Sequence, residues 1–228
     1  MARAARKAAE SVKQRVYRNL RDSIMSGAVP PGLPITILGV AERLEVSPMP
    51  VREALHRLVA DGALEYMDNR RVRVPPMTAA KFDEIVIARL ALETMAAERA
   101  LPFIDADRLS RLRELDDQIE IAYKAEDLEQ AIARNFAFHR CLYEVSGPSV
   151  LMQLIESVWL RLGPFMREAT AKLDETYRVD RHAEAMDAIV AGDPEALKVA
   201  IAADIQDGVG HLGRRFLSDG EKAGTAGR

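Results

Sequence analysis

The chain has 228 residues, of which 48% are hydrophobic and 29% charged, and these fractions exclude a disordered or fibrous protein. Its one cysteine, Cys141, excludes an internal disulfide framework and a cysteine-rich zinc finger, and it is typical of a reducing, cytoplasmic location. Residues 1–77 hold 13 Lys and Arg against 8 Asp and Glu, whereas residues 78–228 hold 19 against 27, so the basic N-terminal third is expected to meet a polyanion.

Apolar residues recur every four positions near the N-terminus, after a segment over residues 1–10 that we expect to be flexible. The recurring residues are Val12, Val16, Leu20 and Ile24. This spacing predicts an amphipathic helix from about residue 11 to Met25. Gly27 and the proline-rich stretch that follows it are expected to end the helix, because proline lacks the backbone N–H that a helix needs.

Two short helices separated by a tight turn are predicted next. Thr36 can cap the first of them, and Ser47 can cap the second. Pro48 suits the first position of the second helix, where a backbone N–H is not needed. The buried stripe of this helix consists of Val51, Leu55 and Leu58. The arrangement is typical of a helix-turn-helix.

A β-hairpin is predicted after Gly62. Residues 63–67 and 71–74 flank a turn-forming segment, and the second run alternates apolar and basic residues. Three arginines lie at or near its tip: Arg70, Arg71 and Arg73. With the preceding helices, the hairpin makes residues 11–76 a winged helix-turn-helix domain.

A winged helix predicts binding to double-stranded DNA. A helix fits the major groove, and the residues at its N-terminus meet the base edges. The candidate contacts on this helix are Ser47, Met49, Arg52 and Arg57. Arg52 can donate two hydrogen bonds to a guanine or contact a phosphate, and the wing arginines can enter a minor groove or neutralise phosphates. The alternative interpretation is a solvated basic face that binds no nucleic acid.

The rest of the chain shows helical periodicity and no convincing strand. Helices are expected over residues 79–100, 106–124, 127–145, 148–168, 171–192 and 194–217. Residues 77–218 therefore predict an all-α helical bundle for effector binding and dimerisation, followed by a disordered tail over 219–228. The predicted fold class is mostly α, with the small hairpin as its β-structure. No apolar run approaches the ~20 residues of a membrane span, so no membrane partner is expected.

Polar side chains interrupt the apolar faces of the bundle helices. Four of them form a candidate metal site: Asn135, His139, His182 and Asp204. Two imidazoles, a carboxylate and an amide oxygen suit Zn²⁺, Ni²⁺, Mn²⁺ or Fe²⁺. Arg89 lies among apolar residues on the first bundle helix and can bind the carboxylate of an effector through two hydrogen bonds. The alternative is that His139 is an ordinary core histidine, while His182 and Asp204 are exposed to solvent.

Several sequence motifs lie in the N-terminal part. They are Ile24-x-x-Gly27, Pro31-Gly32, the run Val-Ser-Pro-Met-Pro-Val-Arg-Glu-Ala-Leu at residues 46–55, Leu58 and Gly62. This pattern resembles the DNA-binding half of the GntR family of bacterial transcription regulators, which implies a homodimer on a short palindromic operator. The chain departs from the family pattern at Glu45 and Arg71, where relatives carry glycine. It also has Thr36-Ile37-Leu38 where they carry Ser-Glu-Arg, and Pro48 where they carry arginine. We therefore expect an unusual operator.

A second set of motifs covers residues 79–215. It comprises Arg89-x-x-x-Glu93 followed by Ala96-Ala97, then Asn135-x-x-Phe138-His139, and then His182 ahead of Ala188-Ile189-x-x-Gly192-Asp193. These motifs look like the FCD domain, the ligand-binding half of the FadR branch of the GntR family. In metal-binding relatives the ligands are an Asp and three His. They map to Asn135, His139, His182 and Asp204, so the first Asp is Asn here and the third His is Asp.

The sequence thus predicts a transcription regulator whose DNA affinity responds to a small carboxylate, with a divalent metal as a candidate cofactor. The resemblance implies a repressor that the effector releases from DNA. One alternative is a metal-dependent helical enzyme, but no nucleophile motif or general base accompanies the candidate ligands, so no enzymatic activity is expected. Another alternative is a regulator whose bundle only dimerises.

Overall fold

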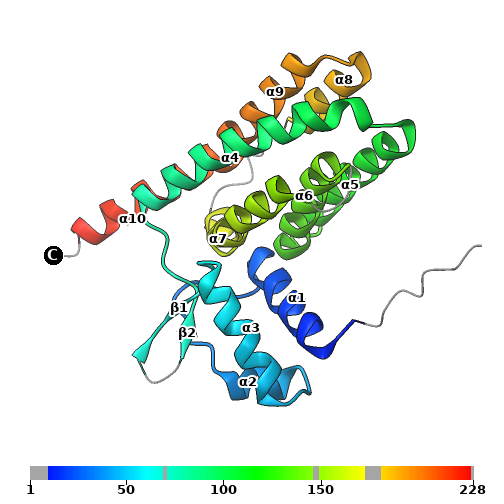
Figure 1. Ribbon diagram of the computed structural model, residues 1–228. Coiled ribbons are helices and arrows are strands. Elements are labelled where there is room, and N and C mark those ends of the chain that lie inside the picture. The colour runs from blue at the N-terminus through cyan, green and yellow to red at the C-terminus, as the bar shows by residue number, and fades with distance from the viewer. Residues whose placement is uncertain (1–9, 69–70, 146–148, 173–180, 227–228) are drawn as a thin grey trace, which may run out of the picture.

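The computed structural model describes residues 10–68, 71–145, 149–172 and 181–226. They form a small N-terminal unit, called here the head (residues 12–74), and a larger helical bundle (residues 79–226) (Figure 1). The predicted class, mostly α with one small β-hairpin, is confirmed. The predicted flexible segment over residues 1–10 falls, up to residue 9, outside the described residues, as does Arg70 at the tip of the hairpin.

The head contains three helices and two short strands. They are α1 (Val12–Met25), α2 (Ile37–Arg43), α3 (Pro48–Ala60), β1 (Glu65–Tyr66) and β2 (Val72–Arg73). The strands pair antiparallel, with Glu65 opposite Arg73 and Tyr66 opposite Val72. Val72 also exchanges two backbone hydrogen bonds with Ile35, which ties the segment before α2 to the hairpin. The winged helix-turn-helix is therefore present as predicted.

Caps and one strained residue set the geometry around α2 and α3. The Thr36 hydroxyl accepts a hydrogen bond from the Gly39 N–H at 3.1 Å, as predicted. Ser47 lies at the N-cap of α3 but makes no side-chain cap, and Pro50 leaves the third helical position without an N–H to offer it. Glu45 lies in the turn with a φ of 52°, a left-handed conformation that glycine adopts without strain.

The bundle is built from long helices in chain order. They are α4 (Ala79–Ala100), the short helix η2 (Leu101–Phe103), α5 (Ala106–Lys124), α6 (Leu128–Tyr143), α7 (Val150–Lys172), α8 (His182–Ala191), α9 (Pro194–Ala203), the π-helical turn η3 (Asp204–Gly210) and α10 (His211–Ala226). The first two helices predicted for the bundle, over 79–100 and 106–124, match α4 and α5 residue for residue. No helix among the described residues combines the length and apolar character that crossing a membrane requires.

Four of the helices predicted for the bundle have other boundaries in the structure, and the one expected over 127–145 runs from Leu128 to Tyr143. The helix expected over 148–168 continues past Pro164 to Lys172, and the one expected over 194–217 is divided by the π-helical turn. Of the helix expected over 171–192, the described part begins at His182. The tail predicted as disordered over 219–228 is helical up to Ala226, where good helix formers outnumber the glycines.

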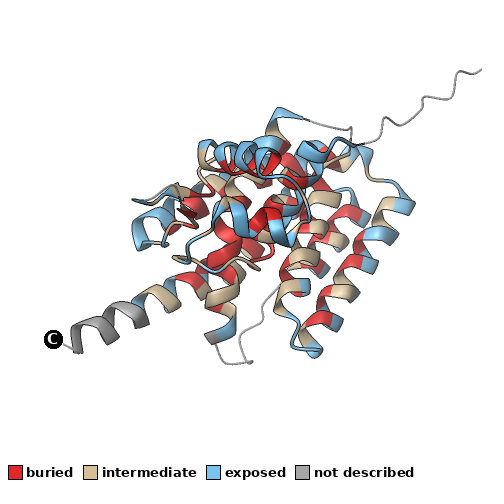
Figure 2. Cartoon of the chain, turned by 90° about the horizontal axis from the view of Figure 1, so that it is seen from below, coloured by how far each residue is buried: buried red, intermediate tan, exposed pale blue. Residues whose placement is uncertain are grey.

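The head meets the bundle mainly through α1 and α7 (Figure 1). Gly163 of α7 lies directly against the carbonyl group of Met25, at a distance that leaves no room for a side chain. Arg21 pairs with Glu156 at 3.2 Å, and the Arg167 guanidinium donates to the Gly27 carbonyl at 3.2 Å. Figure 2 shows that buried residues run along the inner faces of the bundle helices and into the head. The α1–α7 contact is thus a close helix-to-helix seam.

Candidate metal centre and DNA-reading surface

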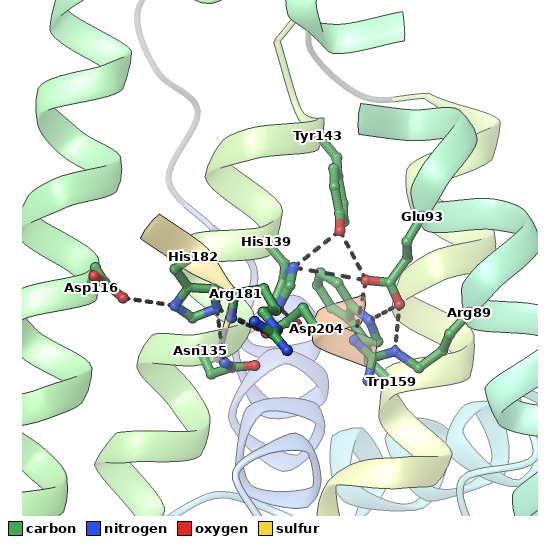
Figure 3. Close-up of polar contacts among 10 residues, drawn as sticks. All are labelled: Arg89, Glu93, Asp116, Asn135, His139, Tyr143, Trp159, Arg181, His182 and Asp204. Atoms are coloured by element: carbon green, nitrogen blue, oxygen red, sulfur yellow. Dashed lines mark hydrogen bonds and ion pairs between the residues drawn. The ribbon is translucent and has the colours of Figure 1, made fainter. Parts of the chain in front are cut away.

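Three of the predicted metal ligands meet in the interior of the bundle (Figure 3). His139 lies on α6, His182 opens α8, and Asp204 lies where α9 passes into the π-helical turn. All three are buried, with 0%, 0% and 7% of their surface exposed, and one ligand atom from each lies within 4.8 Å of the others. The alternative interpretation, in which His182 and Asp204 face solvent, is therefore wrong.

Neighbouring groups fix the orientation of the His182 ring. Its Nδ1 lies 2.7 Å from a carboxylate oxygen of Asp116 on α5, and the ring stacks on Phe138 with centroids 3.9 Å apart. A carboxylate only accepts hydrogen bonds when ionised, so Nδ1 carries the proton. The lone pair is therefore on Nε2, which lies 3.8 Å from an Asp204 carboxylate oxygen.

A second chain of hydrogen bonds fixes His139. The Tyr143 hydroxyl donates to Glu93 at 3.2 Å and lies 3.0 Å from His139 Nδ1. Burial and the Glu93 carboxylate raise the pKa of Tyr143 well above its ordinary value, so the hydroxyl keeps its single proton for Glu93. His139 Nδ1 then donates to the Tyr143 hydroxyl oxygen, and Nε2 is the ring nitrogen that faces Asp204.

The Nε2 atom of His139 is the unsatisfied atom of this arrangement. It is fully buried and makes no well-formed hydrogen bond, yet it lies 3.2 Å from Asp204 Oδ2. Burial opposes ionisation of Asp204, but His139, His182 and Arg89 outweigh it and hold the pKa of this carboxyl below its ordinary value. An imidazole lone pair that faces a buried carboxylate requires a cation between them, either a proton or a metal ion.

The donor set fits a divalent metal. Two imidazole nitrogens and one carboxylate oxygen converge, with Asp116 in the supporting position that metal-binding histidines usually have. Asn135 lies on the same face of α6 as His139, with its side-chain nitrogen 3.5 Å from His182 Nε2. Asp204 starts a π-helical turn, a feature common at functional sites. The four predicted residues are therefore together, three of them with ligand atoms facing one another.

Arg89, predicted to bind an effector, lies beside this cluster in a buried ion pair. Its guanidinium donates to both oxygens of Glu93, at 2.6 and 3.2 Å. Burial disfavours the charge, but Glu93 outweighs burial and keeps the pKa of Arg89 above its ordinary value. The Trp159 indole also donates to Glu93, at 2.8 Å. Glu93 thus joins Arg89, Trp159 and Tyr143 into one network.

Sequence reasoning missed Asp116 and Tyr143, and it named Glu93 only within a family motif, with no role of its own. Glu93 and Tyr143 carry a detectable signal, because each lies four residues after a singled-out residue, Arg89 and His139, on the same helix face. Asp116 has no local signal. Its partner His182 is 66 residues away in the chain, and only the packing of α5 against α8 brings the two together.

The start of α3 is the exposed surface of the head that the sequence assigned to DNA. Ser47, Met49 and Arg52 are exposed there, and Met49 has 57% of its surface free. In Figure 1, α2 lies at the end of the head far from the bundle, and α3 runs from there toward the bundle. An exposed helix N-terminus of this kind can enter a major groove without obstruction from the rest of the chain.

Two of the other candidate DNA contacts have partners within the head. Arg57 lies over the ring of Tyr17, 3.8 Å from its centroid, and thereby helps to attach α3 to α1. Arg73 pairs with Glu65 across the hairpin at 2.7 Å. Arg71 is half-buried. Arg52 is thus the arginine at the exposed tip of α3.

A winged helix with a free recognition-helix tip, joined to a helical bundle with a buried polar site, defines a ligand-responsive transcription regulator. The chain matches the description "Bacterial regulatory proteins, gntR family" over residues 12–74 and the FCD domain over residues 84–207. It belongs to the GntR family and is a FadR-type regulator with an FCD effector-binding domain.

Known relatives agree with this assignment. The chain is 30% identical over 209 residues to the HTH-type transcriptional regulator McbR of Escherichia coli, which covers 90% of this chain and 95% of McbR. The structure of E. coli McbR/YncC superimposes with a TM-score of 0.84 at 28% identity, covering 91% and 99% of the two chains. A GntR transcriptional regulator from Rhodococcus sp. RHA1 gives a TM-score of 0.72 at 26% identity, covering 92% and 99%. These relatives are regulators, which favours the regulator over the enzyme alternative.

Proposed function

We propose that the chain is a cytoplasmic repressor whose affinity for its operator is controlled by a small carboxylate bound in the bundle beside a divalent metal. The observation that carries this proposal is the buried convergence of His139, His182 and Asp204, with the His139 Nε2 atom lacking a hydrogen bond. Repression is supported by a relative, the gluconate operon transcriptional repressor of Bacillus subtilis, 29% identical over 153 residues that cover 67% of this chain and 60% of the relative.

The chain's own residues would hold both the metal and the effector. His139, His182 and Asp204 would bind Zn²⁺, Ni²⁺, Mn²⁺ or Fe²⁺, with Asn135 as a candidate fourth ligand. When bound, the metal supplies a Lewis acid that can bind an effector carboxylate. Arg89 uses two of its five N–H groups on Glu93, so the remaining ones can donate to the same carboxylate.

The head would bind the operator as one half of a homodimer. Two copies related by a two-fold axis read the two halves of a palindrome. Ser47, Met49 and Arg52 would meet base edges in the major groove. The wing arginines Arg70, Arg71 and Arg73, together with Arg57, would contribute positive charge near the phosphates.

Helix α7 connects the two sites. Its Trp159 donates to Glu93 in the network that touches the metal cluster, and Gly163, one turn further along, lies against the last turn of α1. A change in the network that shifts α7 would therefore displace the head, and with it the spacing of the two recognition helices in a dimer. This coupling would act reciprocally, because an effector that weakens operator binding must itself bind less tightly when the operator is bound.

The test combines metal analysis with operator selection on the full chain. We expect metal in the purified protein and a selected operator that contains an inverted repeat. His139→Ala should abolish metal binding while the apo protein still prefers its operator, and Arg52→Ala should weaken operator binding with the metal content unchanged. His211→Ala, which removes an exposed histidine from α10, is the matched control and should change neither property. A protein with no preference over bulk DNA would refute the regulator, and unaltered metal content in His139→Ala would refute the metal site.

A further inference from the structure

A cavity lies between the head and the bundle, apart from the metal cluster. It has a volume of about 360 Å³. Gly62 and Ala63, after α3, line it from the head, residues 75–77 of the connecting segment form a second wall, and α4 and α7 form the third. Volumes of this size are typical of small-molecule sites, which occur preferentially between domains.

The lining combines apolar walls with a small number of charged groups. Met77, Ile85 and Val158 are among the apolar residues. The three charged residues are Lys81, Glu84 and Arg161. Two cations against one carboxylate favour a ligand with one negative charge, because a second anionic group would be brought close to Glu84.

The Arg161 guanidinium is held in place at this cavity. Its Nη1 donates to the backbone carbonyl and the hydroxyl of Ser157, at 3.2 and 3.1 Å. A Cβ atom added at position 62 would lie 2.7 Å from Nη2 and 2.9 Å from Nε, so the guanidinium packs directly against Gly62. A fixed guanidinium loses little entropy when it binds a carboxylate, which strengthens binding.

We propose that this cavity binds a small amphipathic monoanion, with its apolar part against Met77, Ile85 and Val158 and its single carboxylate on Arg161. Such a ligand would touch the head, the connecting segment and the bundle together. It would therefore fix the orientation of the head without involving His139, His182 or Asp204. The protein would then have two inputs, a carboxylate effector in the bundle and a monoanion at the junction.

The experiment is calorimetric titration of the full chain with 2-naphthoate, an aromatic monocarboxylate. We expect saturable binding of one ligand per chain, at least tenfold weaker binding of naphthalene-2,6-dicarboxylate, and at least a tenfold loss of 2-naphthoate affinity in Arg161→Leu. Arg113→Leu, which removes an exposed arginine from α5, is the matched control and should bind like the wild type. Ala88→Leu, which fills the cavity from α4, should also abolish binding.

The outcomes separate this proposal from the metal-dependent function. His139→Ala should retain 2-naphthoate binding, so failure of the metal site leaves this result intact. Absence of saturable binding, equal affinity for the dicarboxylate, or unchanged affinity in Arg161→Leu would overturn the proposal. It would also be overturned if Arg161→Leu altered the sedimenting mass of the protein without altering ligand binding, because the cavity would then be a contact between two copies of the chain.

Discussion

Replacement of Gly163 by alanine tests the seam between α7 and α1. An added Cβ would overlap the Met25 carbonyl oxygen and lie 2.6 Å from its carbon, whereas ordinary contacts begin at 3.4 Å. The obstacle is backbone in a helix, so α1 must move away from α7 by about 1 Å. Overpacking of this kind costs about 1–3 kcal/mol, and the upper end applies because no flexible side chain can yield.

The net effect follows from two opposing contributions. Alanine is more favourable than glycine in a helix by about 1 kcal/mol, so the free energy of unfolding should fall by a net of about 2 kcal/mol. For a chain of this length the thermal midpoint should fall by roughly 4–8 °C in scanning calorimetry. Operator affinity should change as well, because the head is displaced.

The matched control for this prediction is Gly39→Ala on α2. Its Cβ meets, among the described residues, only the Thr36 hydroxyl, at 3.0 Å, which caps α2. The helix gain and the disturbed cap should nearly cancel, so the midpoint should stay close to the wild-type value. If Gly163→Ala melts at or above the wild-type midpoint, the close contact between α7 and α1 is wrong. The proposed coupling of the metal cluster to the head through α7 then loses its support.

Three other predictions concern the metal cluster and the DNA-reading surface. Asp116→Asn should weaken Co²⁺ binding by about 10- to 100-fold while His182 stays in place, as measured by the visible absorbance of bound Co²⁺. An unchanged affinity would show that Asp116 does not orient His182. Because the pKa of Asp204 is lowered in the folded chain, its ionised form stabilises the apo fold above about pH 4. The stability difference between wild type and Asp204→Asn should therefore shrink as the pH falls below that value. A difference that stays constant in thermal melts at acid pH would contradict this. Arg52→Ala should reduce selectivity for the operator over a single-base variant by about 1–3 kcal/mol in binding titrations, whereas a uniform loss on all DNA would indicate a phosphate contact instead.

The fold class could be predicted from the sequence because its signals are local. Four-residue apolar spacing predicts α1, and the predicted bounds of α4 and α5 coincide with local signals, because Thr78 and Asp105 cap these helices and Pro102 follows the first. The π-helical turn at Asp204 was not predictable, since the surrounding residues continue an ordinary helical pattern. Pro50 is a local signal against a Ser47 cap, since it removes one of the two N–H groups that such a cap can use.

The sequence by itself determined that His139, His182 and Asp204 are chemically suited to a metal, because residue type and spacing on a helix are local properties. Only the tertiary structure decided which imidazole nitrogens carry protons, because Asp116, Tyr143 and Glu93 come from other helices or from a neighbouring turn. The tertiary structure also buries Arg89, so its charge is stabilised by Glu93 and not by solvent. Protonation and pairing depend on the distances between side chains far apart in the chain, and packing alone sets those distances.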